Sequence, residues 1–525
     1  MPLVNCLTDE LGGAQARTSV ETMSRGSMPY TRTGKTHVLV PWCCGAVLSV
    51  IAIWMTAEPG FATVTISSAQ TKNMSCSNGV CVPTAADAVL NVSDLETMLA
   101  SGNATVTTTG AGSVQASDID VSAGISWVSS GVLSLIAWRS LEIKKPIAVN
   151  GASGLSVATN SGGAGGMFYF GPKGNVTFLD LASSLTINGT AYTFVNSVAS
   201  LASAVSSNPG GDYALANNYD ASHDGTYARS PVSTELSGVF EGLGNNISNL
   251  SINDPVSGDY VGLFSEIGSG NQPGGMVENI ALRNIGIGGN GLAVGGLVGL
   301  NIGTINGSFA GGSVTSNLQQ GSEIGLLVGA SGGSIARSAA TGTVKSSWPE
   351  SGGGLVGGNH SGFITQSYAN CNVLAGASSG LGGLVGTNVG TITQSYAMGK
   401  VSGGDRSDVG GLMGESGEAS TIAQAYSTTA VKLDRDTGGH KGGLIGVDGP
   451  PAGNNSFAYW DTTNSKITSP SHGAGNIKND PGITGLTTTQ LQSGLPAGFD
   501  PAIWAENPKI NNGYPYLIAN PPRKK

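Results

Sequence analysis

Charged residues are scarce in this chain. Among 525 residues there are 24 Lys and Arg and 33 Asp and Glu, and aromatic residues make up 6%. The basic residues form no patch of the kind that binds nucleic acid, so a nucleic-acid partner is excluded. No segment keeps an apolar period of 3.6 residues, which excludes a helical repeat. Low charge can accompany disorder, but 39% of the residues are hydrophobic and they recur periodically, which disorder does not require.

Glycine, in contrast, is abundant, with 83 residues, and it marks one repeated motif. A sequence close to Gly-Gly-Leu-Val-Gly occurs six times between Gly295 and Gly446. Its central leucines are separated by 30, 28, 29, 28 and 32 residues: Leu297, Leu327, Leu355, Leu384, Leu412 and Leu444. This period predicts a solenoid, because a single unit cannot bury its apolar face without neighbours on both sides.

Further positions recur after five of the six leucines. An isoleucine is followed four residues later by an aromatic residue or alanine: Ile305, Ile335, Ile364, Ile392, Ile422 and Phe309, Ala339, Tyr368, Tyr396, Tyr426. Short β-branched and aromatic segments between glycine turns predict a parallel β-solenoid, with about one coil per 28–32-residue repeat and ladders of stacked leucine and aromatic side chains inside it. Strict alternation would put Gln366, Gln394 and Gln424 on the isoleucine face, so a turn or bulge is expected there.

The N-terminal residues 1–62 read as an extended signal region. Four basic residues precede an apolar run over residues 38–55, and the small residues Gly60 and Ala62 suit cleavage after Ala62. A membrane anchor is the alternative, since a run of 18 residues is near the lower limit for spanning. Pro41 within the run favours the signal peptide. We therefore expect a secreted or cell-surface protein with no membrane span after cleavage.

Three cysteines lie beyond this region. Cys76 and Cys81 flank an Asn-Gly turn, and a disulfide between them fits an oxidising compartment. A metal pair is the weaker alternative, because no histidine or second cysteine pair lies nearby in the sequence. Cys371 occupies an ordinary repeat position and is expected to be buried.

Composition divides the remaining chain into four parts. Residues 63–235 are expected to form an N-terminal cap and irregular β-helix coils, and residues 236–290 transition coils. The regular repeats cover residues 291–460, and residues 461–525 form a C-terminal capping segment and tail. Caps are required because the open ends of a solenoid are unpaired strand edges.

The segment from Gly382 to Val401 resembles the GLUG motif of filamentous-haemagglutinin-like exoproteins of Gram-negative bacteria. Matching flanking sequences extend the resemblance over roughly Leu95 to Leu517. It implies a right-handed parallel β-helix on the cell surface, exported with an outer-membrane secretion partner. GLUG repeats also occur in proteins described as peptidases, so the resemblance leaves the activity open.

Three segments match catalytic or cofactor-binding motifs, but the sequence around them does not support those functions. Gly329–Gly333 and Gly376–Gly380 match Gly-x-Ser-x-Gly, but that motif needs a strand entering a helix, and both lie in glycine-rich repeat loops. Gly286–Gly291 matches Gly-x-Gly-x-x-Gly without a following helix. Acids within the repeats do not recur at one position, and His360 and His440 look isolated. No catalytic, cofactor-binding or metal-binding residue is therefore predicted.

These observations favour an adhesin-like rod without enzymatic activity. Its partner would be a glycan or protein of a host or neighbouring cell, bound by the loops. The alternatives are a carbohydrate-active or peptidase β-helix enzyme and an inert structural or biofilm-matrix rod. Three or more carboxylates facing one groove would favour the enzyme, and an exposed stripe of aromatic residues would favour binding.

Overall fold

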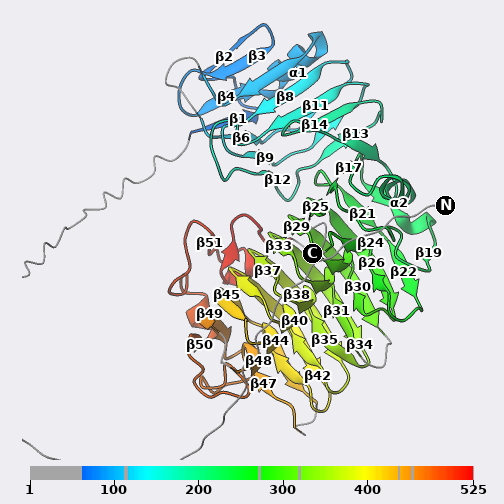
Figure 1. Ribbon diagram of the computed structural model, residues 1–525. Helices are drawn as coiled ribbons and strands as arrows, with labels where there is room; N and C mark the ends of the chain where they lie inside the picture. The colour runs from blue at the N-terminus through cyan, green and yellow to red at the C-terminus, as the bar shows by residue number, and fades with distance from the viewer. Residues whose placement is uncertain are drawn as a thin grey trace, which may run out of the picture. The chain divides into compact units, whose positions relative to one another are not determined.

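The computed structural model describes residues 62–110, 116–269, 274–316, 321–434, 438–450 and 454–523 (Figure 1). The predicted signal region lies outside these ranges, apart from Ala62. None of the helices within them combines the length and the apolar character that crossing a membrane requires.

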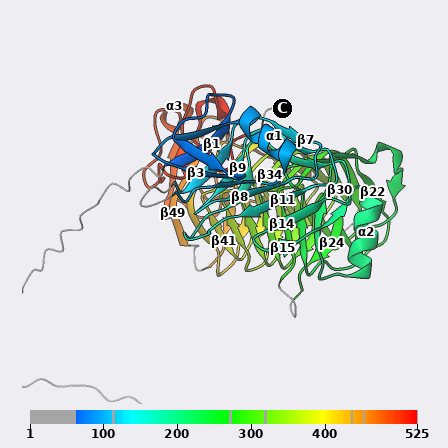
Figure 2. The ribbon, with the colours of Figure 1, turned by 90° about the horizontal axis from the view of Figure 1, so that it is seen from above.

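The structure confirms the predicted all-β parallel solenoid. Among the described strands only three pairs are antiparallel, and successive coils otherwise pair in parallel. Helices are few and short: α1 (Val92–Ser101), α2 (Val198–Ser207) and α3 (Thr488–Leu491). Seen from above, the later coils follow one another across the picture, from green beside α2 to orange (Figure 2).

The coils form two consecutive blocks with separate interior cores. The first block, residues 62–191, has three sheets. One contains β4 (Ala88–Asn91), β1 (Thr63–Ser67), β6 (Asp118–Val121), β9 (Leu141–Ile143) and β12 (Phe168–Phe170). The second contains β7 (Ile125–Trp127), β10 (Ile147–Val149) and β13 (Val176–Phe178). The third contains β2 (Met74–Ser77), β3 (Val80–Pro83), β5 (Ala104–Thr107), β8 (Val132–Ile136), β11 (Gly154–Ala158), β14 (Ser184–Ile187) and β15 (Thr190–Ala191).

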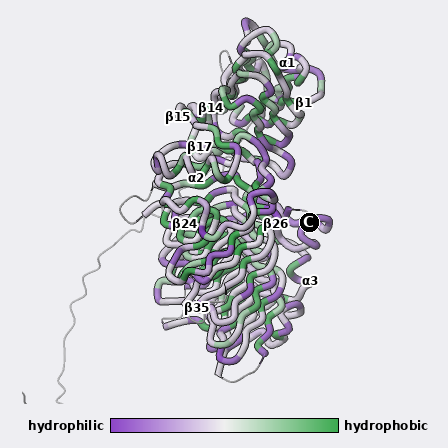
Figure 3. The backbone as a smooth tube through the Cα atoms, turned by 90° about the vertical axis from the view of Figure 1, so that its right-hand side faces the viewer, coloured by the Kyte–Doolittle hydropathy of each residue, from purple (hydrophilic) through white to green (hydrophobic). Residues whose placement is uncertain are grey.

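The second block, residues 193–486, contains the regular repeats. Its largest sheet has 21 strands, among them β20 (Val239–Glu241), β25 (Met276–Glu278), β26 (Ala281–Gly289), β29 (Thr304–Asn306), β30 (Phe309–Ser316), β33 (Ser334–Ala336), β34 (Ala339–Ser346), β37 (Phe363–Thr365), β38 (Tyr368–Ala375), β41 (Thr391–Thr393), β42 (Tyr396–Gly403), β45 (Thr421–Ser427), β49 (Asn454–Asp461) and β50 (Ile483–Leu486). Two seven-stranded sheets complete each coil; in one repeat they contribute β39 (Gly380–Gly382) and β40 (Val385–Asn388). Hydrophobic and hydrophilic segments alternate along the coils (Figure 3).

Hydrogen bonds join the two blocks end to end. The amide nitrogen of Val176 in β13 donates to the carbonyl oxygen of Leu243 at 2.9 Å, and Phe178 donates to Ala216 at 2.9 Å. The core of the first block extends to Ile187 and also includes Ala214, Ala216 and Leu243, whereas the core of the second block begins at Val195. The two cores therefore overlap along the chain between Val195 and Leu243.

The repeated leucines form one buried ladder at the corner between the two seven-stranded sheets. All six, Leu297, Leu327, Leu355, Leu384, Leu412 and Leu444, have no exposed surface. Glycine precedes them because the chain turns sharply there. A Cβ atom added to Gly382 would lie 1.9 Å from the carbonyl oxygen of Val385, so no larger residue fits without rearrangement.

The three glutamines lie in turns, as predicted from the break in the alternation of side chains between the two faces of a strand. Gln366, Gln394 and Gln424 have φ angles of 46°, 48° and 52°, in the left-handed region. Each follows a three-residue strand or the equivalent position in β45. Their side chains are linked along the stack, with Gln366 Nε2 donating to Gln394 Oε1 at 3.4 Å and Gln394 Nε2 to Gln424 Oε1 at 3.3 Å.

The tyrosine ladder is stacked, but it lies outside the solenoid interior. Tyr368, Tyr396 and Tyr426 stack with ring centroids 4.9 and 5.1 Å apart. Because side chains alternate along a strand, the following residues Ala369 and Ala397 face the interior core instead. The tyrosines belong to a separate cluster together with C-terminal residues: Leu491, Phe499, Trp504, Tyr514 and Leu517. The expectation of an aromatic ladder inside the coils was therefore wrong.

Residues 487–523, here called the strap, cover this ladder. The Tyr426 hydroxyl donates to the carbonyl oxygen of Pro515 at 2.6 Å, and Asn520 Nδ2 donates to the carbonyl oxygens of Ser338 and Gln366 at 3.2 and 3.0 Å. Only the preceding residues close the end of the interior core, through Trp460, Ile467 and Ala474. The predicted capping segment thus has two parts, an end cap and a cover along one side.

A carboxyl pair in the end cap makes stability depend on pH. Asp480 is 4% exposed, and its burial, together with the charge of Asp448, raises its pKa from 3.8 to about 7. Since the folded state holds this proton more tightly than the unfolded state, stability falls as pH rises from 3.8 to about 7. We expect Asp480→Asn to raise the melting temperature at pH 8 but not at pH 4. An equal shift at both pH values would contradict this assignment.

Candidate functional site

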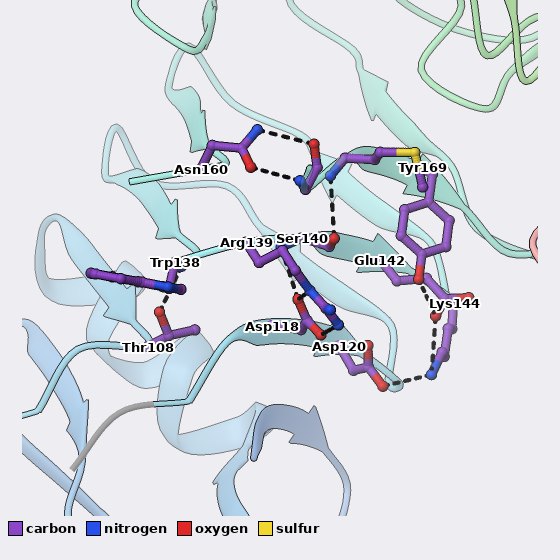
Figure 4. Close-up of polar contacts among 12 residues, drawn as sticks. Thr108, Asp118, Asp120, Trp138, Arg139, Ser140, Glu142, Lys144, Asn160 and Tyr169 are labelled. Carbon is purple, nitrogen blue, oxygen red and sulfur yellow. Dashed lines mark hydrogen bonds and ion pairs between the residues drawn. The ribbon is translucent and has the colours of Figure 1, made fainter. Parts of the chain in front are cut away.

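A network of charged side chains covers the outer face of β6 and β9 (Figure 4). Alternation along β6 turns Ile119 and Val121 into the core and leaves Asp118 and Asp120 outside. The Arg139 guanidinium binds Asp118 through two nitrogens, at 3.0 and 2.6 Å. Burial opposes ionisation of Asp118, but hydrogen bonds from Arg139 and Ser140 outweigh it and hold the pKa of Asp118 below its usual value.

Lys144 continues this network toward β12. Its Nζ lies 2.6 Å from Asp120 and 3.2 Å from Glu142, and the Tyr169 hydroxyl donates to Glu142 at 3.2 Å. Burial would lower the pKa of Lys144, but the two carboxylates raise it overall. Three carboxylates are thus gathered on one face, and each of them forms an ion pair with one of two cations.

A cavity of about 120 Å³ opens beside Glu142 and Tyr169. Its other wall belongs to the largest sheet of the second block and includes Arg283 from β26, Asn306 from β29 and Arg337 in the turn after β33. The strap contributes the rest of the lining: Ile518, Ala519, Asn520, Pro521 and Arg523. We call this space the arginine cavity. Because it is lined by both blocks and the strap, its shape depends on all three.

The arginines of this cavity are held by neutral groups. Arg337 Nη2 donates to Asn306 Oδ1 at 2.7 Å, and Asn306 Nδ2 donates to Glu278 Oε1 at 2.8 Å. Arg523 and Arg283 both lie against the Phe309 ring, 4.8 and 5.7 Å from its centroid. Within the described ranges, none of these three guanidiniums forms an ion pair with a carboxylate.

A buried carboxyl lies behind the cavity wall. Glu241 is 2% exposed, and its burial and the nearby charge of Glu278 raise its pKa well above the usual value. Its Oε1 accepts from the amide nitrogen of Leu243 at 2.7 Å, and its Oε2 accepts from Asn279 Nδ2 at 3.0 Å. Glu241 therefore fixes the orientation of Asn279, which lines the cavity.

The residues that the sequence singled out as structural do not line the arginine cavity. Cys76 and Cys81 form a disulfide with an S–S distance of 2.04 Å, and Cys371 is free and buried. Neither the leucine and tyrosine ladders nor Ile364 and Ile392 line the arginine cavity. No group of three or more potential metal ligands occurs in the part of the chain that the structure describes.

Neither serine motif leads from a strand into a helix, as a nucleophile elbow does. Ser331 is fully buried at the end of β32 (Val328–Ser331) and accepts a hydrogen bond from Asn301 Nδ2 at 2.9 Å, while Ser378 lies in a turn between β38 and β39. The histidines, however, are not isolated as expected. His360 Nε2 lies 2.7 Å from Glu323, and His440 Nδ1 lies 2.8 Å from Asp408. Each pair joins neighbouring coils, which a single repeat cannot reveal.

Comparison with known proteins adds little to this description. No family model matches the chain, and no curated protein matches it. A solved structure from Bacteroides ovatus, provisionally named an immunoglobulin A1 protease, is similar with a TM-score of 0.41 and 19% identity, covering 63% of this chain and 93% of that one. A structure named IgA1 protease has a TM-score of 0.37 and 19% identity, covering 50% of this chain and 21% of that one.

Proposed function

We propose that this β-solenoid protein is an exported, adhesin-like rod that binds a glycan of a host or neighbouring cell. The observation that supports this most directly is the arginine cavity, a polar recess whose guanidiniums have no carboxylate partners in the described ranges. The repeats themselves supply length and rigidity through buried ladders. The GLUG resemblance supports the same proposal.

The aromatic ladder is not the binding surface in this proposal. Stacked tyrosines on the outside of a sheet are suited to sugar rings, but the strap covers them, and Tyr396 and Tyr426 have no exposed surface. The expected loop contacts therefore give way to the cavity as the binding site.

A glycan array probed with the purified protein tests the proposal. We expect retention on a defined subset of glycans, and attachment of beads coated with the protein to cells that display them. Absence of binding to every glycan and every cell surface would refute the adhesin-like function.

The gathered carboxylates give the enzymatic alternative one supporting observation. Asp118, Asp120 and Glu142 share one face, as a glycosidase or lyase would require. Arg139 and Lys144 occupy them, however, and a general acid needs a carboxyl that holds its proton near neutral pH. We expect no turnover of polyuronate, mucin or immunoglobulin substrates. Turnover that disappears in Glu142→Gln would establish the enzyme instead.

Export is part of the same proposal and has its own test. We expect the N-terminal sequence of the secreted protein to begin at Thr63, because cleavage follows Ala62. Retention of residues 38–62 in the mature protein would contradict a cleaved signal peptide.

A further inference from the structure

We propose that the arginine cavity binds the carboxylate of an acidic sugar, with Arg283, Arg337 and Arg523 as its ligands. This inference rests on the proposed glycan-binding function and names the chemical class of the glycan.

An excess of positive charge at the cavity carries the argument. Three guanidiniums line the space, and Glu142 is the one carboxylate that lines it with them. Glu142 already contacts Lys144 at 3.2 Å and accepts from the Tyr169 hydroxyl. Glu278 stands behind Asn306, whose amide separates it from Arg337. The cavity thus has cationic groups whose charge its own lining does not compensate.

Two of these cations also repel each other. Arg283 and Arg523 both lie against Phe309, within 5.7 and 4.8 Å of the ring centroid. The ring stabilises each cation modestly, but like charges around one ring are unfavourable without a counter-ion. An anion placed between them would replace the repulsion by two charge-assisted hydrogen bonds.

The geometry favours a carboxylate on a sugar over other anions. Guanidinium groups match planar carboxylates through paired N–H donors. Glu142 and Tyr169, which come from the first block, can bind hydroxyl groups, since a carboxylate accepts from them and a phenol oxygen can accept one more bond. A sugar acid presents both kinds of group on one ring. A cavity of about 120 Å³ admits a small unit of this kind and excludes a folded polypeptide segment.

Arg337 stands at a position where the following coils have glutamine. Its φ of 46° equals that of Gln366 and is close to those of Gln394 and Gln424. In the strand register, Ala336 pairs with Thr365, so Arg337 and Gln366 occupy the same turn of successive coils. The turn therefore does not require arginine. Arg337→Gln is consequently a variant that the fold already tolerates at this position in three neighbouring coils.

Isothermal calorimetry on the purified full chain tests the assignment with three ligands: oligogalacturonate, the same oligomer with its carboxyls reduced, and a sulfated oligosaccharide of equal length. We expect the uronate to bind at least tenfold more tightly than the reduced oligomer. We also expect Arg337→Gln to weaken uronate binding at least tenfold. Arg337→Lys keeps the charge but loses the planar fork, so its loss should be smaller.

Arg229→Gln is the matched control, because it removes the same charge from an exposed residue outside the cavity. It should leave uronate binding unchanged, and unaltered melting temperatures would show that all variants are folded. Equal binding of the uronate and its reduced form, or full binding by Arg337→Gln, would overturn the proposal. Preference for the sulfated oligomer would overturn the carboxylate assignment.

The outcome can be separated from that of the proposed function. Array binding to neutral glycans that Arg337→Gln does not affect would leave the adhesin-like function standing and refute the acidic-sugar site. Conversely, calorimetric binding of the uronate by a protein that attaches to no cell would support the site and refute the adhesin-like function.

Discussion

Replacing Leu384 by aspartate should lower the free energy of unfolding by roughly 5 kcal/mol or more, because it creates a cavity and places a charge in an apolar interior. Leu384 has no exposed surface and stacks between Leu355 and Leu412 in the ladder. Chemical denaturation followed by circular dichroism would measure the effect. We expect the loss of cooperative unfolding in the second block.

Two controls isolate the cause. Leu384→Met conserves volume and should cost less than about 1.5 kcal/mol. Phe363→Asp introduces the same charge on a side chain that is 60% exposed, so it should change stability by about 0.5 kcal/mol or less. A Leu384→Asp variant as stable as these controls would refute the coil assignment.

Replacing Trp504 by alanine should cost about 3–5 kcal/mol, as expected for a buried aromatic residue. Trp504 is 1% exposed and packs against Tyr396, Tyr426 and Phe499, with ring centroids 6.1, 5.9 and 4.6 Å away. Its loss should loosen the strap and expose the tyrosine ladder. Thermal melting and the fluorescence of a dye that binds exposed apolar surface would report both effects.

Trp348→Ala is the matched control for this prediction. Trp348 is 45% exposed, and surface substitutions of this kind usually change stability by about 0.5 kcal/mol or less. If Trp504→Ala behaves like Trp348→Ala, the strap does not contribute to stability as its burial indicates.

The repeat alone was sufficient to predict the coils, because each leucine packs against the same leucine one period away. The repeat pattern also predicted turns at Gln366, Gln394 and Gln424, because strict alternation of side chains along a strand would have put these polar residues on the isoleucine face. The strap could not be predicted in this way. Its contacts, such as that between the Arg523 amide nitrogen and the Tyr368 hydroxyl at 3.1 Å, join segments that share no period.

The candidate site was missed for a related reason. The charged network lies in the first block, outside the repeats, where Asp118-Ile-Asp-Val and Leu141-Glu-Ile-Lys alternate charged and apolar residues. That pattern placed carboxylates outside neighbouring strands and was a usable signal. No comparable sequence pattern predicted the arginine cavity. Arg283, Arg337 and Arg523 are far apart in the sequence and are brought together by the stacking of the coils and by the strap, which runs back along them.

The length of the strap limits the number of coils that it can cover. It begins beside the end cap and extends back along the ladder until Arg523 reaches Phe309. Duplication of one repeat would move its far contacts by one rung, about 4.8 Å, and would withdraw Arg523 from the cavity. A solenoid otherwise tolerates the gain or loss of whole units. In this protein, a change in repeat number would therefore have to be matched by a change in strap length.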